Sequence, residues 1–120
     1  MSGPRSQPGG TALSMVGLAL KAGQLAVGAE AVASALGRHR AHLVVLAKDL
    51  SDGSRRRIER DAKDVPTLCL TETMERMGQA LGRSKTGVAA VLDHHLAQAI
   101  SRRQELLDGG EGGPSSRLDR

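Results

Sequence analysis

The chain has 120 residues, enough for one compact domain with a hydrophobic core and too few for two. It contains no Phe, Tyr or Trp, which disfavours the RNA-binding modules that stack unpaired bases on aromatic side chains. The net charge of +4 favours a polyanionic partner, and a single cysteine excludes an internal disulfide and fits a reducing cytoplasm.

Residues 1–10 and 108–120 are rich in Gly, Pro and Ser, so we expect two disordered tails on either side of one domain over residues 11–107. No apolar run approaches the roughly 20 residues that a membrane-spanning helix requires. Lys21 interrupts the only apolar stretch near the start that could imitate a signal peptide. We therefore expect a cytoplasmic protein that acts as a monomer away from membranes.

Apolar residues at i, i+3, i+4 and i+7 over residues 13–20 predict an amphipathic helix that Thr11 caps and Gly23 ends. A short strand or extended link follows at residues 24–27. Residues 28–37 then predict a second helix. Its inward face is expected at Ala31, Val32, Ala35 and Leu36.

A basic turn of Arg38, His39, Arg40 and His42 leads into a continuous apolar run at residues 43–47, which predicts a strand covered on both faces. Asp49 and Ser51 are placed to cap a third helix that Val65–Pro66 ends. The arginines at positions 55–57 of this helix are interspersed with acidic residues. We interpret them first as an exposed, salt-bridged face and alternatively as an RNA contact.

Residues 67–70 predict another strand, in which Cys69 is expected to be a small apolar residue rather than a reactive thiol. Thr71 or Thr73 is expected to cap a fourth helix. An apolar strand at residues 88–92 and a last helix from about 93 to 107 complete the domain. The side chains expected to point inward from these two helices are Met74, Met77, Leu81, Leu96, Ile100 and Leu107.

Helices and strands thus alternate along the whole of residues 11–107. This order predicts an α/β fold, a three-layer α/β/α sandwich around a mixed sheet of about four strands.

No pattern in the chain is typical of a catalytic site or a nucleotide-binding loop. His39 and His42 are three residues apart and His94 adjoins His95, but neither pair has carboxylate or thiolate companions at the spacing of metal ligands. We expect no enzymatic activity, no metal and no cofactor, and histidines that are solvated or lie near phosphate.

Gly28 and Glu30 allow two interpretations. Gly28 could simply ease a turn, while Glu30 complements the dipole of the helix that follows. Alternatively, the free N–H groups of the helix start face phosphate, and the Glu30 carboxylate accepts hydrogen bonds from a purine edge.

Several short motifs in this chain occur in the order and spacing of a known family. They are Leu18-Ala-Leu-Lys-Ala-Gly-Gln-Leu25, Gly28-x-Glu30, Leu43-Val-Val-Leu-Ala-Lys-Asp49, Val65-Pro66 and Met77-Gly-Gln-Ala-Leu-Gly82 before an apolar strand. Over residues 11–100 the chain resembles the kink-turn RNA-binding superfamily of ribosomal proteins, of the archaeal L7Ae and eukaryotic L30e type. It is most similar to the small bacterial branch of ribosomal-protein-like RNA binders.

The resemblance implies an α/β/α sandwich that binds a sharply bent RNA with tandem sheared G·A pairs. It implies that residues 28–30 lie against this RNA and that the loop at residues 83–88 touches it from the other side. Family members commonly carry Asn where this chain has Ala29, Lys where it has Ala33, and often Glu where it has Lys48. The first two departures remove polar RNA contacts, and the third adds positive charge.

From the residues and the resemblance together we expect structured RNA as the partner, ribosomal or a structured leader. The residues expected to contact RNA are Gly28, Ala29, Glu30, Arg38, Arg40, Lys48, Arg83, Lys85, Thr86 and Val88. The alternative is a protein-binding adaptor on the same fold, in which Ala29 and Ala33 mark a decayed RNA site.

Overall fold

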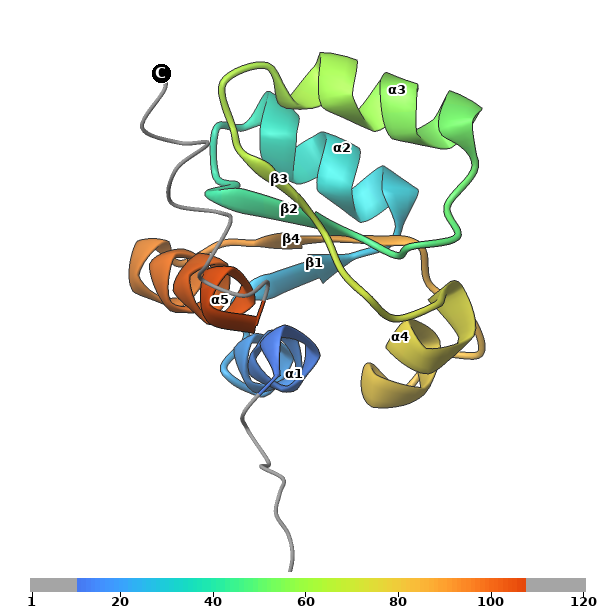
Figure 1. Cartoon of the computed structure of the whole chain (residues 1–120). Coiled ribbons are helices and arrows are strands. Elements are labelled where there is room, and N and C mark those ends of the chain that lie inside the picture. The colour runs from blue at the N-terminus through green and yellow to red at the C-terminus, as the bar shows by residue number, and fades with distance from the viewer. Residues whose placement is uncertain (1–10, 108–120) are drawn as a thin grey trace, which may run out of the picture.

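The computed structural model describes the backbone of residues 11–107 and the side chains of residues 11–103. Within this range a sheet of four strands separates two layers of helices, with α2 and α3 on one face and α1, α4 and α5 on the other (Figure 1). The predicted three-layer α/β/α sandwich with a mixed sheet is confirmed. The two expected tails, residues 1–10 and 108–120, lie outside the described residues.

Along the chain, helices and strands alternate without interruption. The elements are α1 (Ala12–Lys21), β1 (Leu25–Val27), α2 (Ala29–Gly37), β2 (Leu43–Leu46), α3 (Asp52–Ala62), β3 (Thr67–Cys69), α4 (Met74–Ala80), β4 (Val88–Val91) and α5 (His94–Leu107). Each corresponds to an element expected from the sequence, with ends that differ by at most a few residues.

The sheet has the strand order β1-β4-β2-β3. β4 pairs antiparallel with both β1 and β2, while β2 and β3 are parallel. The two central strands, β2 and β4, are buried along their whole length, because helices cover both of their faces. The continuous apolar run at residues 43–47 therefore forms the kind of strand that its pattern predicts.

Side chains that alternate along the central strands supply two separate cores. Val45 of β2 and Val91 of β4 pack with α1, α4 and α5, whereas Val44 and Ala90 pack with α2 and α3. Ile100 of α5 and Met77 of α4 are fully buried in the first core, as expected. Aliphatic residues alone thus fill both layers around the sheet.

Side-chain caps fix where the helices begin. The hydroxyl groups of Thr11, Ser51 and Thr73 accept hydrogen bonds from amides in the first turns of α1, α3 and α4. Thr73, and not Thr71, is therefore the cap of α4. The expectation that Asp49 caps α3 is wrong, because its carboxylate bonds to a different helix.

The inward face of α2 is narrower than expected. Val32 and Ala35 are buried and Leu36 is half-buried, but Ala31 is exposed. Ala31 lies one position before Val32 and therefore about 100° around the helix from it, on the solvent side. None of the helices among the described residues is long and apolar enough to cross a membrane.

Candidate nucleic-acid interface

The first turn of α2 begins at an unusual backbone conformation. Gly28 has φ 97° and ψ 159°, a region that residues with a Cβ rarely occupy. Its N–H donates to the carbonyl of Val88 at the start of β4, at 3.0 Å. No side chain caps α2, so the first amide groups of this helix are left without a capping partner and point toward the edge of the molecule.

The end of β2 meets the same part of the molecule. The N–H of Ala47 donates to the carbonyl of Gly87 at 3.0 Å, and the N–H of Lys48 donates to the carbonyl of Glu72 at 2.9 Å. Together with the bond between Gly28 and Val88, these contacts bring the start of α2, the residues after β2 and the loop before β4 together at one end of the strands.

The loop over residues 82–87 is held tightly against α4. The N–H of Arg83 donates to the carbonyl of Gly78 at 2.7 Å. A Cβ at Gly78 would lie 2.7 Å from both the Cα and the N of Lys85, closer than real Cβ contacts allow. Only glycine at position 78 permits this approach, so α4 determines where Lys85 stands.

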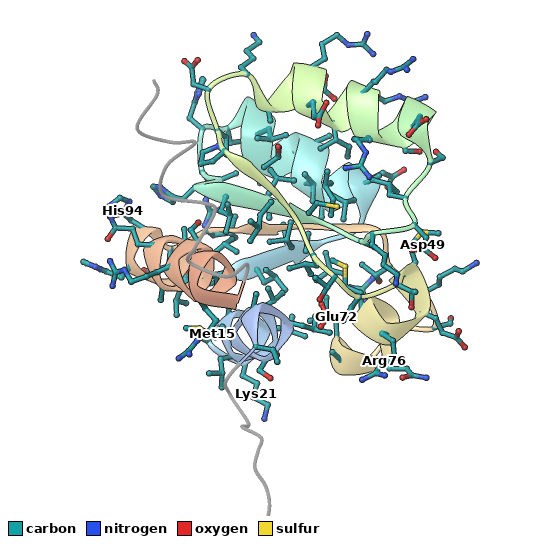
Figure 2. All side chains as sticks on the ribbon, in the orientation of Figure 1. Met15, Lys21, Asp49, Glu72, Arg76 and His94 are labelled. Carbon is teal, nitrogen blue, oxygen red and sulfur yellow. The ribbon has the colours of Figure 1, made fainter. Side chains whose placement is uncertain are left out.

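Asp49 links the residues after β2 to α4. Its Oδ1 accepts a hydrogen bond from the N–H of Met74, the first residue of α4, at 2.8 Å. Figure 2 shows Asp49 and Glu72 on the same side of the molecule, close to α4. Sequence reasoning missed this role because an Asp two residues before a Ser is an ordinary helix-capping pattern, and its real partner lies 25 residues away.

The site residues expected from the sequence differ in their exposure. Ala29, Glu30, Lys48, Arg83 and Lys85 are exposed on the segments that these backbone contacts join. We call these five residues and Gly28 the α2 edge.

Two expected contact residues have buried side chains. Thr86 is 6% exposed and Val88 is 4% exposed. The N–H of Thr86 donates to the carbonyl of Met74, and the carbonyl of Val88 accepts from Gly28. Their side chains are therefore not available to a partner, and both residues hold the loop in place. Contact of these two residues with RNA stays a prediction.

Arg38 and Arg40 lie at the opposite end of α2 from Glu30. The helix has nine residues, which separates its ends by about 13 Å. The two arginines line a hollow of about 190 Å³ with residues of α2, β1 and the end of β4. The structure therefore does not bring them together with the start of α2.

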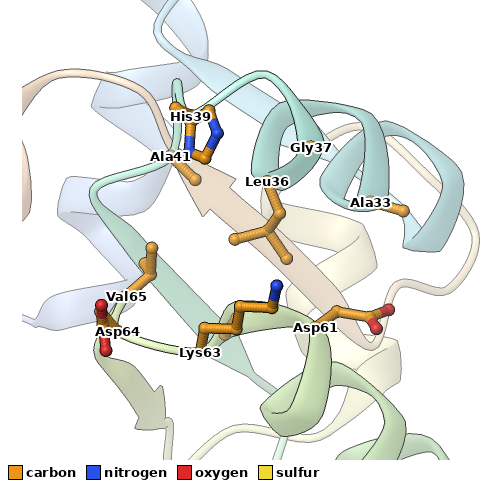
Figure 3. A pocket seen from close by; sticks show the side chains of 10 residues that line it. Ala33, Leu36, Gly37, His39, Ala41, Asp61, Lys63, Asp64 and Val65 are labelled. Atoms are coloured by element: carbon orange, nitrogen blue, oxygen red, sulfur yellow. The ribbon is translucent and has the colours of Figure 1, made fainter.

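A second hollow at that far end lies between the C-terminal ends of α2 and α3 (Figure 3). It has a volume of about 490 Å³, and its side chains include Leu36, His39, Asp61 and Lys63. The mixture of an apolar floor with both signs of charge favours no single class of ligand. This hollow is separate from the α2 edge.

The arginines of α3 do not form one uniform exposed face. Arg57 lines a groove of about 220 Å³ with Ala29, Glu30 and Ile58, between α2 and α3. Arg55 points instead toward β3, where its Nη1 donates to the Sγ of Cys69 at 3.6 Å, and this hydrogen bond raises the pKa of Arg55. Cys69 lies inside a strand, as expected, and it is exposed because β3 is at the edge of the sheet.

The positions of the side chains also bear on metal binding. Among the described residues, no three His, Cys, Asp or Glu side chains gather closely enough to hold a metal ion. The candidate chemistry at the α2 edge is therefore that of a helix start with free amides, one carboxylate and several cations.

Comparison with known proteins adds to this geometry. The model of the "Ribosomal protein L7Ae/L30e/S12e/Gadd45 family" matches residues 11–100. No curated protein sequence matches the chain.

Two solved structures are similar in fold. One is a protein with unknown function from Bacillus halodurans, with a TM-score of 0.71 and 24% identity, covering 77% of this chain and 94% of that one. The other is the Giardia lamblia 15.5kD RNA binding protein, with a TM-score of 0.63 and 21% identity, covering 83% of this chain and 88% of that one. At these identities the likeness shows a shared fold.

Proposed function

We propose that this chain, which belongs to the Ribosomal protein L7Ae/L30e/S12e/Gadd45 family, binds structured RNA through the α2 edge. A protein of the same fold is named as an RNA binding protein, the 15.5kD protein of Giardia lamblia. The function is recognition rather than catalysis. Its setting is the cytoplasm, where the protein acts as a monomer on ribosomal RNA or a structured leader.

One observation carries the proposal. The hydrogen bonds from Gly28 to Val88 and from Ala47 to Gly87 join three segments that are far apart in sequence. These bonds join the uncapped start of α2, which carries the exposed Glu30, to the segment with the exposed Lys48 and to the loop with the exposed Arg83 and Lys85. Such a combination offers both positive groups for phosphates and an acceptor for base edges.

The residues of the α2 edge have different roles in the proposed recognition of RNA. Arg83 and Lys85 are exposed on a loop that α4 holds in place, so they suit phosphate contacts without reading sequence. Glu30 is exposed in the first turn of α2, where its carboxylate accepts hydrogen bonds from the amino groups of bases. Shape and backbone contacts thus supply the affinity, and Glu30 supplies the selectivity.

The more specific proposal is that the target is a kink-turn-like RNA, a sharply bent RNA with tandem sheared G·A pairs. Ala29 and Ala33 are both exposed on α2, so the polar residues that family members commonly carry there would fit without disturbing the core. With alanine at both positions this chain makes fewer polar contacts. We therefore expect weaker binding of a kink-turn RNA than a family member with Asn and Lys would give.

The test is the affinity of full-length protein for a kink-turn RNA, measured by mobility shift for the wild type and matched variants. Glu30→Ala should weaken binding by about 5-fold to 150-fold, since a base-edge contact contributes about 1 to 3 kcal/mol. Replacing both Arg83 and Lys85 by Gln should weaken binding of all RNAs alike and make it less sensitive to salt, because each removes a phosphate contact.

Glu75→Ala is the matched control. Glu75 is exposed in the first turn of α4, so it resembles Glu30 in position on its helix but lies outside the α2 edge. Its loss should leave RNA affinity unchanged. If Glu30→Ala and the double loop variant also bind RNA as tightly as the wild type, the proposal is wrong.

A second candidate function is a protein-binding adaptor on the same fold. It is favoured by the exposed alanines of α2 and by the groove that Ala29, Val32, Ala33 and Ile58 line. The dependence of binding affinity on salt concentration distinguishes the two functions. Binding through phosphates weakens steeply, by orders of magnitude between about 50 and 200 mM salt for several contacts, whereas an apolar protein interface changes little.

A further inference from the structure

A hollow of about 410 Å³ lies at the end of the strands opposite to Glu30. Its walls come from the residues just before β2 and β3 and from one side of α5. The lining residues are His42, Pro66, His94, Ala97, Gln98, Ser101 and Arg102. Figure 2 shows His94 on the side of the molecule away from Asp49 and Glu72, so this hollow is separate from the α2 edge.

The polar groups of α5 converge on the hollow because of their spacing. Gln98, Ser101 and Arg102 follow His94 by four, seven and eight residues, which places all of them on one face of a helix. The fifth polar group, His42, reaches the hollow from the sheet. The imidazole rings of His42 and His94 meet edge to face, with their centroids 5.6 Å apart.

Among the side chains that the structure describes, the lining holds one guanidinium, two imidazoles, one amide and one hydroxyl, and no carboxylate. The acid that adjoins it in sequence, Asp93, uses its Oδ2 to accept from the N–H of Leu96 at 2.9 Å. The lining extends along the side of α5, from its first residue, His94, to Arg102.

We propose that this hollow binds a phosphoryl group. Arg102 would contact it through two parallel N–H groups, the geometry in which guanidinium pairs with phosphate. Ser101, Gln98 and the two imidazoles donate further hydrogen bonds. The group comes either from an RNA backbone or from a small phosphorylated compound. The proposal extends beyond RNA binding at the α2 edge and does not depend on Glu30.

A metal ion is the competing ligand for clustered histidines. His95 lies 5.8 Å from His94, centroid to centroid, but it does not line the hollow. Two imidazoles without a third ligand do not form a protein metal site of the usual kind, and the described side chains offer no third ligand. An anion therefore fits the hollow better than a cation.

The experiment is an NMR titration of full-length protein with inorganic phosphate, following the imidazole signals of His42 and His94. Saturable shifts are expected for these two residues and not for His39, which is exposed elsewhere. Arg102→Gln should weaken the apparent affinity by about tenfold, the scale of one lost charge-assisted contact. Arg102 is exposed, so the variant is expected to fold normally.

Arg76→Gln is the matched control, because Arg76 is an exposed arginine on α4, on the other side of the molecule from His94 (Figure 2). It should titrate like the wild type. Shifts that do not saturate, or equal affinities for the Arg102 and Arg76 variants, would overturn the proposal.

Two further measurements on Arg102→Gln, its affinity for RNA and its affinity for a nucleoside monophosphate, identify the source of the phosphoryl group. Loss of RNA affinity in Arg102→Gln would assign the hollow to the RNA backbone. Unchanged RNA affinity together with weakened binding of a nucleoside monophosphate would assign it to a small phosphorylated compound. If neither ligand distinguishes Arg102→Gln from Arg76→Gln, the hollow has no such role. None of these results touches the test of Glu30, so the two proposals can fail separately.

Discussion

Gly28 determines how α2 meets the rest of the molecule. Its positive φ lets the chain turn from β1 into the helix while its N–H reaches Val88 on the neighbouring strand. A Cβ at Gly28 would meet nothing within 4 Å. The requirement for glycine is therefore conformational and does not come from crowding.

Gly28→Ala should lower the free energy of unfolding by about 1 to 3 kcal/mol, because alanine is strained in this region of φ and ψ. The control is Gly37→Ala at the other end of α2, where an added Cβ also meets nothing and φ is ordinary for an L residue. That variant should be neutral or slightly stabilising, since alanine favours helices. Urea unfolding of both variants measures the difference, and equal stabilities would contradict this role for Gly28.

Individual site residues could be predicted from the sequence only in part. Glycine followed two residues later by Glu30 is a local signal, and both residues lie where it indicates. Val88 opens the apolar run that predicts a strand, so its burial could be expected, whereas the burial of Thr86 depends on how the loop meets α4, which no local pattern encodes. The distance of Arg38 and Arg40 from Glu30 follows from the length of α2, a helix that the sequence itself predicts.

The contact between α4 and the loop before β4 positions one side of the α2 edge. Gly78 is buried in the middle of α4, where a glycine weakens a helix by itself. Its place is explained by the backbone of Lys85, which packs where a side chain would otherwise stand. A glycine inside a helical pattern was a usable signal for close packing, although the sequence did not name the partner.

Gly78→Ala should displace the loop, lower the free energy of unfolding by about 1 to 3 kcal/mol through overpacking, and weaken RNA binding. Gly53→Ala is the matched control, because Gly53 also lies in a helix and a Cβ there meets nothing within 4 Å. Thermal unfolding and RNA affinity are measured for both. A Gly78→Ala protein with wild-type stability and affinity would show that the loop is not held as described.

The arrangement of the whole molecule explains why strands of different sequence character share one sheet. β2 and β4 are entirely apolar and central, whereas β3 is short, partly exposed and at the edge. Alternating helices and strands predicted the three layers. The strand order β1-β4-β2-β3 could not be predicted by the same means, because it depends on which strand the last crossover reaches.

That strand order is also what creates the α2 edge. Because β4 lies between β1 and β2, the loop before it comes next to both the start of α2 and the residues after β2. The segments that carry Lys48, Arg83 and Lys85 thereby come to the same end of the strands as the helix start that carries Glu30. The net charge of +4 favours a polyanionic partner, and the proposal of where that partner binds depends on the topology.

The decisive experiment maps the RNA on the protein surface by backbone NMR, titrating full-length protein with a kink-turn RNA. We expect the strongest chemical-shift changes at residues 28–31, 48–50 and 83–87, and saturation at a single affinity that Glu30→Ala weakens. Strongest changes on the far end of α2 or on the outer side of α3, with residues 28–31 unaffected, would contradict RNA binding at the α2 edge.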